Sequence, residues 1–171
     1  MRKLDRTGFI YVVVSSVATL VIVLVVWLIF FRTNSLLPSG IEKQLQFTPF
    51  VVTPNSDINI AGGSYSYDPT NQVLRYTVSS NKTGKLTVSE QTTPPQFIDI
   101  EDYSSKLIDS LNRYSAFDNE FGTVYLTRPK TIQSGQIAIL NADGVLLFVQ
   151  SYKDLSDAQW RQVFQHLRLD Q

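Results

Sequence analysis

The pattern of hydrophobic positions begins with one uninterrupted apolar run, from Phe9 to Phe31. These twenty-three residues include no charged side chain, and seventeen of them are Leu, Ile, Val or Phe. A helix of this length is about 34 Å long, enough to cross the roughly 30 Å hydrocarbon core of a bilayer. The run therefore predicts a transmembrane helix over residues 9–31.

The charges beside this run predict its orientation. Arg2, Lys3 and Arg6 precede it, against the single acid Asp5. An excess of basic residues marks the cytoplasmic side, so residues 1–8 are expected to be a cytoplasmic stub and the C-terminal part to be extracytoplasmic. The run is longer than the apolar region of a cleaved signal peptide, and no small-x-small cleavage site follows it. We therefore expect an uncleaved, single-pass protein of the cell membrane.

A type IV prepilin is the alternative reading of the N-terminus. A short basic leader ends at Gly8, and Phe9 opens the apolar helix, as it does in pilins. Pilins usually carry Glu at the fifth mature position, which here is Val13. Their first helix also continues beyond the membrane, whereas residues 37–40 contain Pro38 and Gly40 and would interrupt it.

Beyond the run, residues 32–46 are predicted to form a stalk, and residues 47–171 a single extracytoplasmic domain. Alternation of apolar and polar residues then predicts short strands. The first set covers residues 47–54, 58–60, 64–67, 73–79 and 85–89, and its last strands form an antiparallel meander. The second set covers residues 123–127, 135–140 and 145–152. Residues 145–149 are apolar on both faces, which favours a central strand.

Two helices are predicted between and after these sets. Apolar residues recur every three or four positions over residues 100–114, and residues 116–122 are expected to be a loop. Ser156 and Gln159 form a capping box that starts a second helix. Its expected buried stripe consists of Trp160, Val163, Phe164 and Leu167. The predicted fold is therefore α+β: two or three strands, a helix, three strands and a helix, with both helices covering one face of an antiparallel sheet.

Composition excludes several functions. The chain has 15 basic and 15 acidic residues, but the part after Arg32 has 11 basic and 14 acidic ones, a formal charge of −3. This is not the basic surface that nucleic acid requires. The chain has no Cys and one His, which leaves no disulfide and no structural zinc site. No glycine motif for phosphate is present, and we expect no cofactor.

Few residues suggest chemistry. His166, expected late in the last helix, has no nucleophile motif around it. The acids at 99, 101, 102, 118 and 120 lack EF-hand spacing, and the first three suit a helix N-terminus. Tyr65, Tyr67 and Tyr76 lie on adjacent predicted strands and form a candidate recognition surface. Cross-strand packing inside the sheet is the alternative for these three tyrosines.

Two stretches carry a resemblance to a known group of domains. One is Leu86-Thr87-Val88-Ser89-Glu90-Gln91, and the other runs from Gly144 through Phe148 and Leu155-Ser156-Asp157 to Trp160. Together with the order of elements, residues 47–169 resemble the small extracytoplasmic domains of unknown function in bacterial membrane-anchored proteins, including those joined to anti-sigma factors and envelope lipoproteins. The resemblance implies a bacterial envelope protein and no particular catalytic residue.

The expected function is therefore a membrane-anchored, non-enzymatic module. Its partners would be the lipid bilayer and either another envelope protein or a cell-wall component. Two alternatives stay open: a hydrolase or transferase acting on cell-wall polymers, and a pilin-like or secretion accessory subunit.

Overall fold

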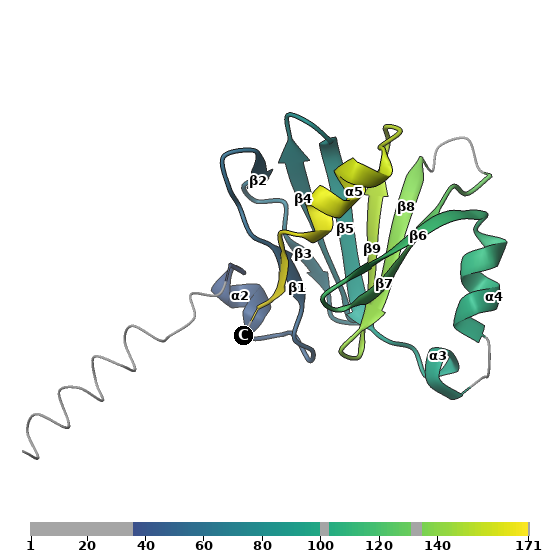
Figure 1. The fold of residues 1–171 in the computed structure, drawn as a ribbon. Helices are drawn as coiled ribbons and strands as arrows, with labels where there is room; N and C mark the ends of the chain where they lie inside the picture. The colour runs from purple at the N-terminus through teal and green to yellow at the C-terminus, as the bar shows by residue number, and fades with distance from the viewer. Residues whose placement is uncertain (1–35, 100–102, 131–134, 171) are drawn as a thin grey trace, which may run out of the picture. The chain divides into compact units, whose positions relative to one another are not determined.

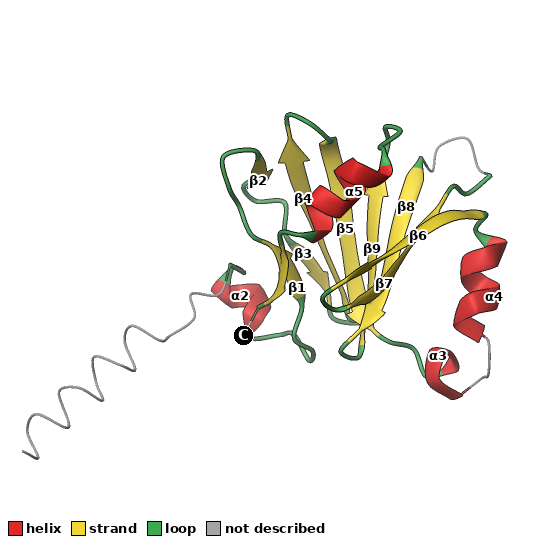
Figure 2. Ribbon diagram, in the orientation of Figure 1, coloured by secondary structure: helices red, strands yellow, loops and turns green. Residues whose placement is uncertain are grey.

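An antiparallel β-sheet organises the part of the chain that the structure describes (Figures 1 and 2). The computed structural model describes residues 36–99, 103–130 and 135–170, all within one unit that extends from Ser35 to Gln171. The predicted stub at 1–8 and the predicted membrane helix at 9–31 lie outside these residues. Among the residues described, no helix has both the length and the apolar character that crossing a bilayer requires.

Short helices precede, separate and follow two runs of consecutive strands. In order they are α2 (Ser39–Glu42), β1 (Phe50–Val52), β2 (Ile58–Ile60), β3 (Ser66–Asp68), β4 (Val73–Ser80), β5 (Gly84–Thr92), α3 (Gln96–Asp99), α4 (Tyr103–Ser110), β6 (Arg113–Asn119), β7 (Gly122–Thr127), β8 (Gln136–Ala142), β9 (Val145–Ser151), α5 (Asp157–Phe164) and β10 (Leu167–Leu169). The large sheet has the order β2-β4-β5-β9-β8-β7-β6, and β3 also pairs with β4. A second sheet joins β1 to β10. The mixed α+β class, dominated by an antiparallel sheet, is as predicted.

The central strand β9 has buried side chains on both faces. Leu147 belongs to the main core, to which α5 contributes Trp160 and Phe164. Leu146 points the other way and packs with Ile108 of α4. Because successive strand residues face opposite sides, α4 and α5 cover opposite faces of the sheet. The prediction that both helices cover one face was wrong: a strand that is apolar on both faces has to be covered on both.

The predicted helix over residues 100–114 was also partly wrong. Helix α4 ends at Ser110, Asn112 adopts a positive φ of 61°, and strand β6 begins at Arg113. Most of the loop expected at 116–122 belongs to β6 and its turn. Only Phe117 of β6 is buried, since β6 is an edge strand, so alternation was too weak to reveal it.

The last helix is shorter than predicted. Ser156 forms the expected capping box with Gln159, but α5 ends at Phe164. Leu167, expected in the helix stripe, belongs to strand β10 and pairs with Val52. A strand of three residues that follows an amphipathic helix at compatible spacing is read as its continuation, because both place Leu167 in the core.

Part of the expected stalk belongs to the domain. Leu37 is only 7 % exposed and lies in the main core, and Ile41 and Leu45 pack against it. These three residues recur every four positions, which is the spacing of a helical face, and the middle one, Ile41, belongs to α2. The N–H of Leu36 also donates to Oδ1 of Asp170, 3.2 Å away. The domain therefore includes residues from Leu36 onward rather than beginning at residue 47.

Two buried side chains of the large sheet, Glu90 and Tyr76, form hydrogen bonds with strand β1. The pairs Thr53–His166 and Pro49–Asp170 are hydrogen-bonded, so the intervening Phe50 points its N–H and C=O away from β10. The N–H donates to Oε2 of Glu90 over 2.6 Å. The hydroxyl of Tyr76 donates to the C=O over 3.0 Å. Both backbone groups of this fully buried residue are thereby satisfied.

Candidate functional site

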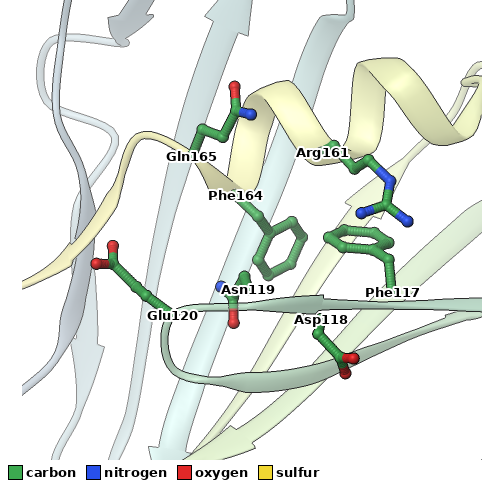
Figure 3. A pocket seen from close by; sticks show the side chains of 7 residues that line it. All are labelled: Phe117, Asp118, Asn119, Glu120, Arg161, Phe164 and Gln165. Atoms are coloured by element: carbon green, nitrogen blue, oxygen red, sulfur yellow. The ribbon is translucent and has the colours of Figure 1, made fainter.

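A pocket of about 320 Å³ lies between α5 and the turn that joins β6 to β7 (Figure 3). Seven residues line it: Phe117, Asp118, Asn119, Glu120, Arg161, Phe164 and Gln165. Its size is at the lower end of the range for small-molecule sites. Residues more than forty positions apart in the sequence meet here, so the pocket exists only in the folded domain.

Simple periodicities place these side chains. Arg161 and Phe164 of α5 and its C-cap residue Gln165 lie on one face of the helix, because Phe164 and Gln165 follow Arg161 by three and four positions. On β6, Phe117 and Asn119 point toward α5, whereas Asp118 points away from it (Figure 3). The hydroxyl of Thr123 donates to the Asp118 carboxylate, 2.7 Å away.

Two phenylalanines form the apolar floor of the pocket. The rings of Phe117 and Phe164 meet edge to face, with centroids 5.8 Å apart. The guanidinium carbon of Arg161 lies 4.7 Å from the centroid of Phe117, within reach of a cation–π interaction. This contact orients the guanidinium and leaves its N–H donors unused by the ring.

The turn of the hairpin is held by Asn119. Its Oδ1 accepts the N–H groups of Phe121 and Gly122, at 3.1 and 3.0 Å. These two bonds orient the amide and direct Nδ2 elsewhere, and Nδ2 is enclosed without a hydrogen-bond partner. The ring of Phe121 packs on Phe50, with centroids 5.0 Å apart, which fixes the turn against β1. Glu120 is therefore carried by a well-anchored turn.

Sequence reasoning did not single out this pocket. It considered Asp118 and Glu120 only as calcium ligands, and it gave no role to Arg161 or Asn119. Phe117 and Asn119 are two positions apart, so both would lie on one face of a strand, and this spacing was the available signal for the pocket. Residues 116–122 were instead predicted to be a loop. Among the described residues, no group of three His, Asp or Glu side chains is arranged to hold a metal ion. Glu101 and Asp102 lie outside those residues.

The three predicted recognition tyrosines have different environments. Tyr76 is 1 % exposed and belongs to the core, so it cannot contribute to an exposed surface. Tyr65 and Tyr67 are half-buried and pack against that core. The rings of Tyr65 and Tyr76 are 5.1 Å apart, which is the packing arrangement considered as the alternative. Burial, with the charges of Asp170 and Glu90, raises the pKa of Tyr65 to about 12.

Glu90 is the most unusual titratable group that the sequence did not reveal. It is fully buried, and burial raises the pKa of its carboxyl well above the usual 4.5, against the opposing effects of its hydrogen bonds. The alternation Leu86, Val88, Glu90 could have identified it, because residues two apart share a face. Its observed contact is structural: it holds the N–H of Phe50.

His166 lies between α5 and β10 rather than within the helix. Its Nε2 is 3.1 Å from the amide nitrogen of Asn55. The Oδ1 atom of Asn55 accepts the N–H groups of Asp57 and Ile58, both at 2.8 Å. His166 thus takes part in a structural contact between β10 and the turn before β2.

Comparison of the chain with protein-family models, with curated proteins and with solved structures finds no match. The resemblance to extracytoplasmic domains of envelope proteins stays a prediction, and any function has to be argued from the residues of this chain.

Proposed function

We propose that this chain is a single-pass protein of a bacterial cell envelope whose extracytoplasmic domain binds a cell-wall component in the pocket between α5 and the β6–β7 turn. A wall ligand is favoured over a protein partner because the binding groups line a hollow of small-molecule size rather than a broad flat surface.

The proposed membrane anchor rests on the uncharged run at 9–31 and the basic residues before it. Leu37, Ile41 and Leu45 pack against the domain core soon after that run. The connection between the proposed anchor and the domain is therefore short, which suits a module that works close to the membrane.

The observation that carries the binding proposal is the position of Arg161. Its guanidinium is held over Phe117 at the pocket, and it makes no ion pair with any other described residue. A guanidinium is suited to bind carboxylate groups in two-bond geometry. Cell-wall polymers present such groups on their sugars and peptides.

Co-sedimentation with isolated cell walls tests this proposal. The full chain in detergent micelles is mixed with purified walls, and the bound fraction is compared with that of Arg161→Gln and Lys106→Gln. Charged hydrogen bonds contribute about 1.5–3 kcal/mol, so the Arg161 variant should bind at least about tenfold more weakly. Lys106 is exposed on α4, away from the pocket, and its variant should bind like the wild type. Equal binding by all three proteins would refute the proposal.

A photo-crosslinking side chain at Gln165 identifies the partner in cells. Gln165 lines the pocket and is exposed, so a crosslinker there reaches a bound ligand. We expect adducts with wall material that disappear in the Arg161→Gln background. If adducts formed only with another envelope protein, the ligand would be a protein partner rather than a wall component.

A further inference from the structure

The charges around the pocket have opposite signs at its two ends. Arg161 and Glu120 stand at opposite ends, with Phe117, Phe164 and Asn119 between them (Figure 3). Arg161 belongs to the middle of α5, whereas Glu120 belongs to the turn after β6. The two side chains are thus held apart by separate elements.

Neither of these charges is neutralised within the described part of the chain. Some exposed charges elsewhere on the domain form ion pairs, such as Lys82–Asp57 at 2.8 Å and Arg128–Asp154 at 3.0 Å. Arg161 contacts only an aromatic ring there, and Glu120 has no ion pair or side-chain hydrogen bond. A ligand with one cationic and one anionic end would complement both.

The middle of the pocket adds one further requirement. The rings of Phe117 and Phe164 offer an apolar surface between the two charges. Nδ2 of Asn119 is too enclosed to bind a ligand. The groups across the pocket are therefore an acceptor for a cation, an apolar surface, and a donor for a carboxylate.

We infer that the pocket binds a short cell-wall peptide that carries a free ammonium group at one end and a free carboxylate at the other. Its α-carboxylate binds Arg161, its apolar part packs on Phe117 and Phe164, and its α-ammonium group binds Glu120. The pocket volume of about 320 Å³ is of the size expected for a small ligand. This inference deepens the proposed wall-binding function and rests on it, since it names the chemical class bound at that site.

Calorimetric titration with the dipeptide alanyl-leucine tests the inference. The full chain in micelles is titrated with the free dipeptide, its N-acetyl derivative and its C-terminal amide. We expect the free dipeptide to bind and each blocked form to bind at least tenfold more weakly. In Arg161→Gln the amide should bind as well as the free dipeptide. In Glu120→Gln the N-acetyl form should do so.

Glu42→Gln serves as the matched control, because Glu42 is exposed on α2 and does not line the pocket. It should keep the wild-type preference for both free termini. No binding of the free dipeptide, or equal binding of all three ligands, overturns the inference. Wall co-sedimentation separates this from failure of the proposed function: if it still depends on Arg161, only the ligand class is wrong.

Discussion

Replacement of Glu90 tests how β1 is held to the sheet. Phe50 is fully buried, and its N–H has the Glu90 carboxyl as its partner at 2.6 Å. Glu90→Leu leaves that N–H unpaired, which costs about 1–3 kcal/mol of unfolding free energy. Glu90→Gln keeps an oxygen acceptor, so it should be more stable than Glu90→Leu by about that amount. The Tyr76 bond to the C=O of Phe50 persists in both variants.

The raised pKa of the Glu90 carboxyl also predicts whether the unfolding free energy rises or falls with pH. Burial raises the pKa of Glu90 above its unfolded value near 4.5, and the charge of Asp170 acts in the same direction. The folded chain therefore keeps a proton that the unfolded chain releases. The resulting stabilisation is complete below about pH 4.5 and is lost as the pH rises toward the folded pKa, at up to about 1.4 kcal/mol per pH unit.

Urea unfolding of the full chain in detergent measures both effects. The fluorescence of Trp160, which is buried, reports unfolding of the domain in a Trp27→Phe background. From pH 5 to pH 8, the wild type should lose stability relative to Glu90→Gln. All other titrating groups are common to both proteins and cancel in the difference. Parallel pH curves for the two proteins, or equal stability of Glu90→Gln and Glu90→Leu, would refute this reasoning.

Three further substitutions test the packing around α5 and β9. Gln136→Leu removes the acceptor of the Trp160 indole N–H, 3.2 Å away, and should lower the unfolding free energy by about 1–3 kcal/mol, as measured by urea titration. Gly135→Ala should destabilise the domain more than Gly144→Ala. Both glycines have positive φ, but a Cβ at 135 would clash with the carbonyl oxygen of Ser151, whereas one at 144 would meet open space. Equal melting temperatures for the two alanine variants would contradict this.

The strands with two-residue alternation were predictable from sequence. Leu74, Tyr76 and Val78 of β4 are buried, as their spacing indicated. The turn between β8 and β9 was visible in Asp143 and Gly144, both of which adopt positive φ. In these strands one face is buried along the whole length. Burial of that face requires apolar residues at every second position, which is the pattern visible in the sequence.

Two strands that the sequence did not reveal lack a local pattern of buried residues. Strand β10 has three residues and is defined by pairing with β1, more than a hundred positions earlier. Strand β6 is an edge strand with one buried side chain. Local pattern carries little information about β10, because its partner is remote in sequence, and little about β6, because a single buried side chain gives no alternation.

The candidate pocket was hidden for a related reason. Asn119 and Arg161 are brought together by the curvature of the sheet and the docking of α5, and neither belongs to a motif. Tyr76 was grouped with Tyr65 and Tyr67 as a candidate recognition surface, with packing as the alternative, because tyrosine alternation alone does not say which face is covered. Strand β1 buries that face, and the Tyr76 hydroxyl donates a hydrogen bond to the backbone C=O of Phe50.

The central claim is that this domain lies outside the cytoplasm, attached by residues 9–31, and cysteine labelling tests it most directly. The chain has no Cys, so a single introduced thiol gives an unambiguous signal. Tyr152 is 62 % exposed, which makes Tyr152→Cys a suitable reporter for the domain, with Thr7→Cys as the reporter for the stub. In intact spheroplasts, a membrane-impermeant maleimide should label the thiol at 152 and should reach the thiol at 7 only after lysis. Labelling at 152 only after lysis would contradict the claim.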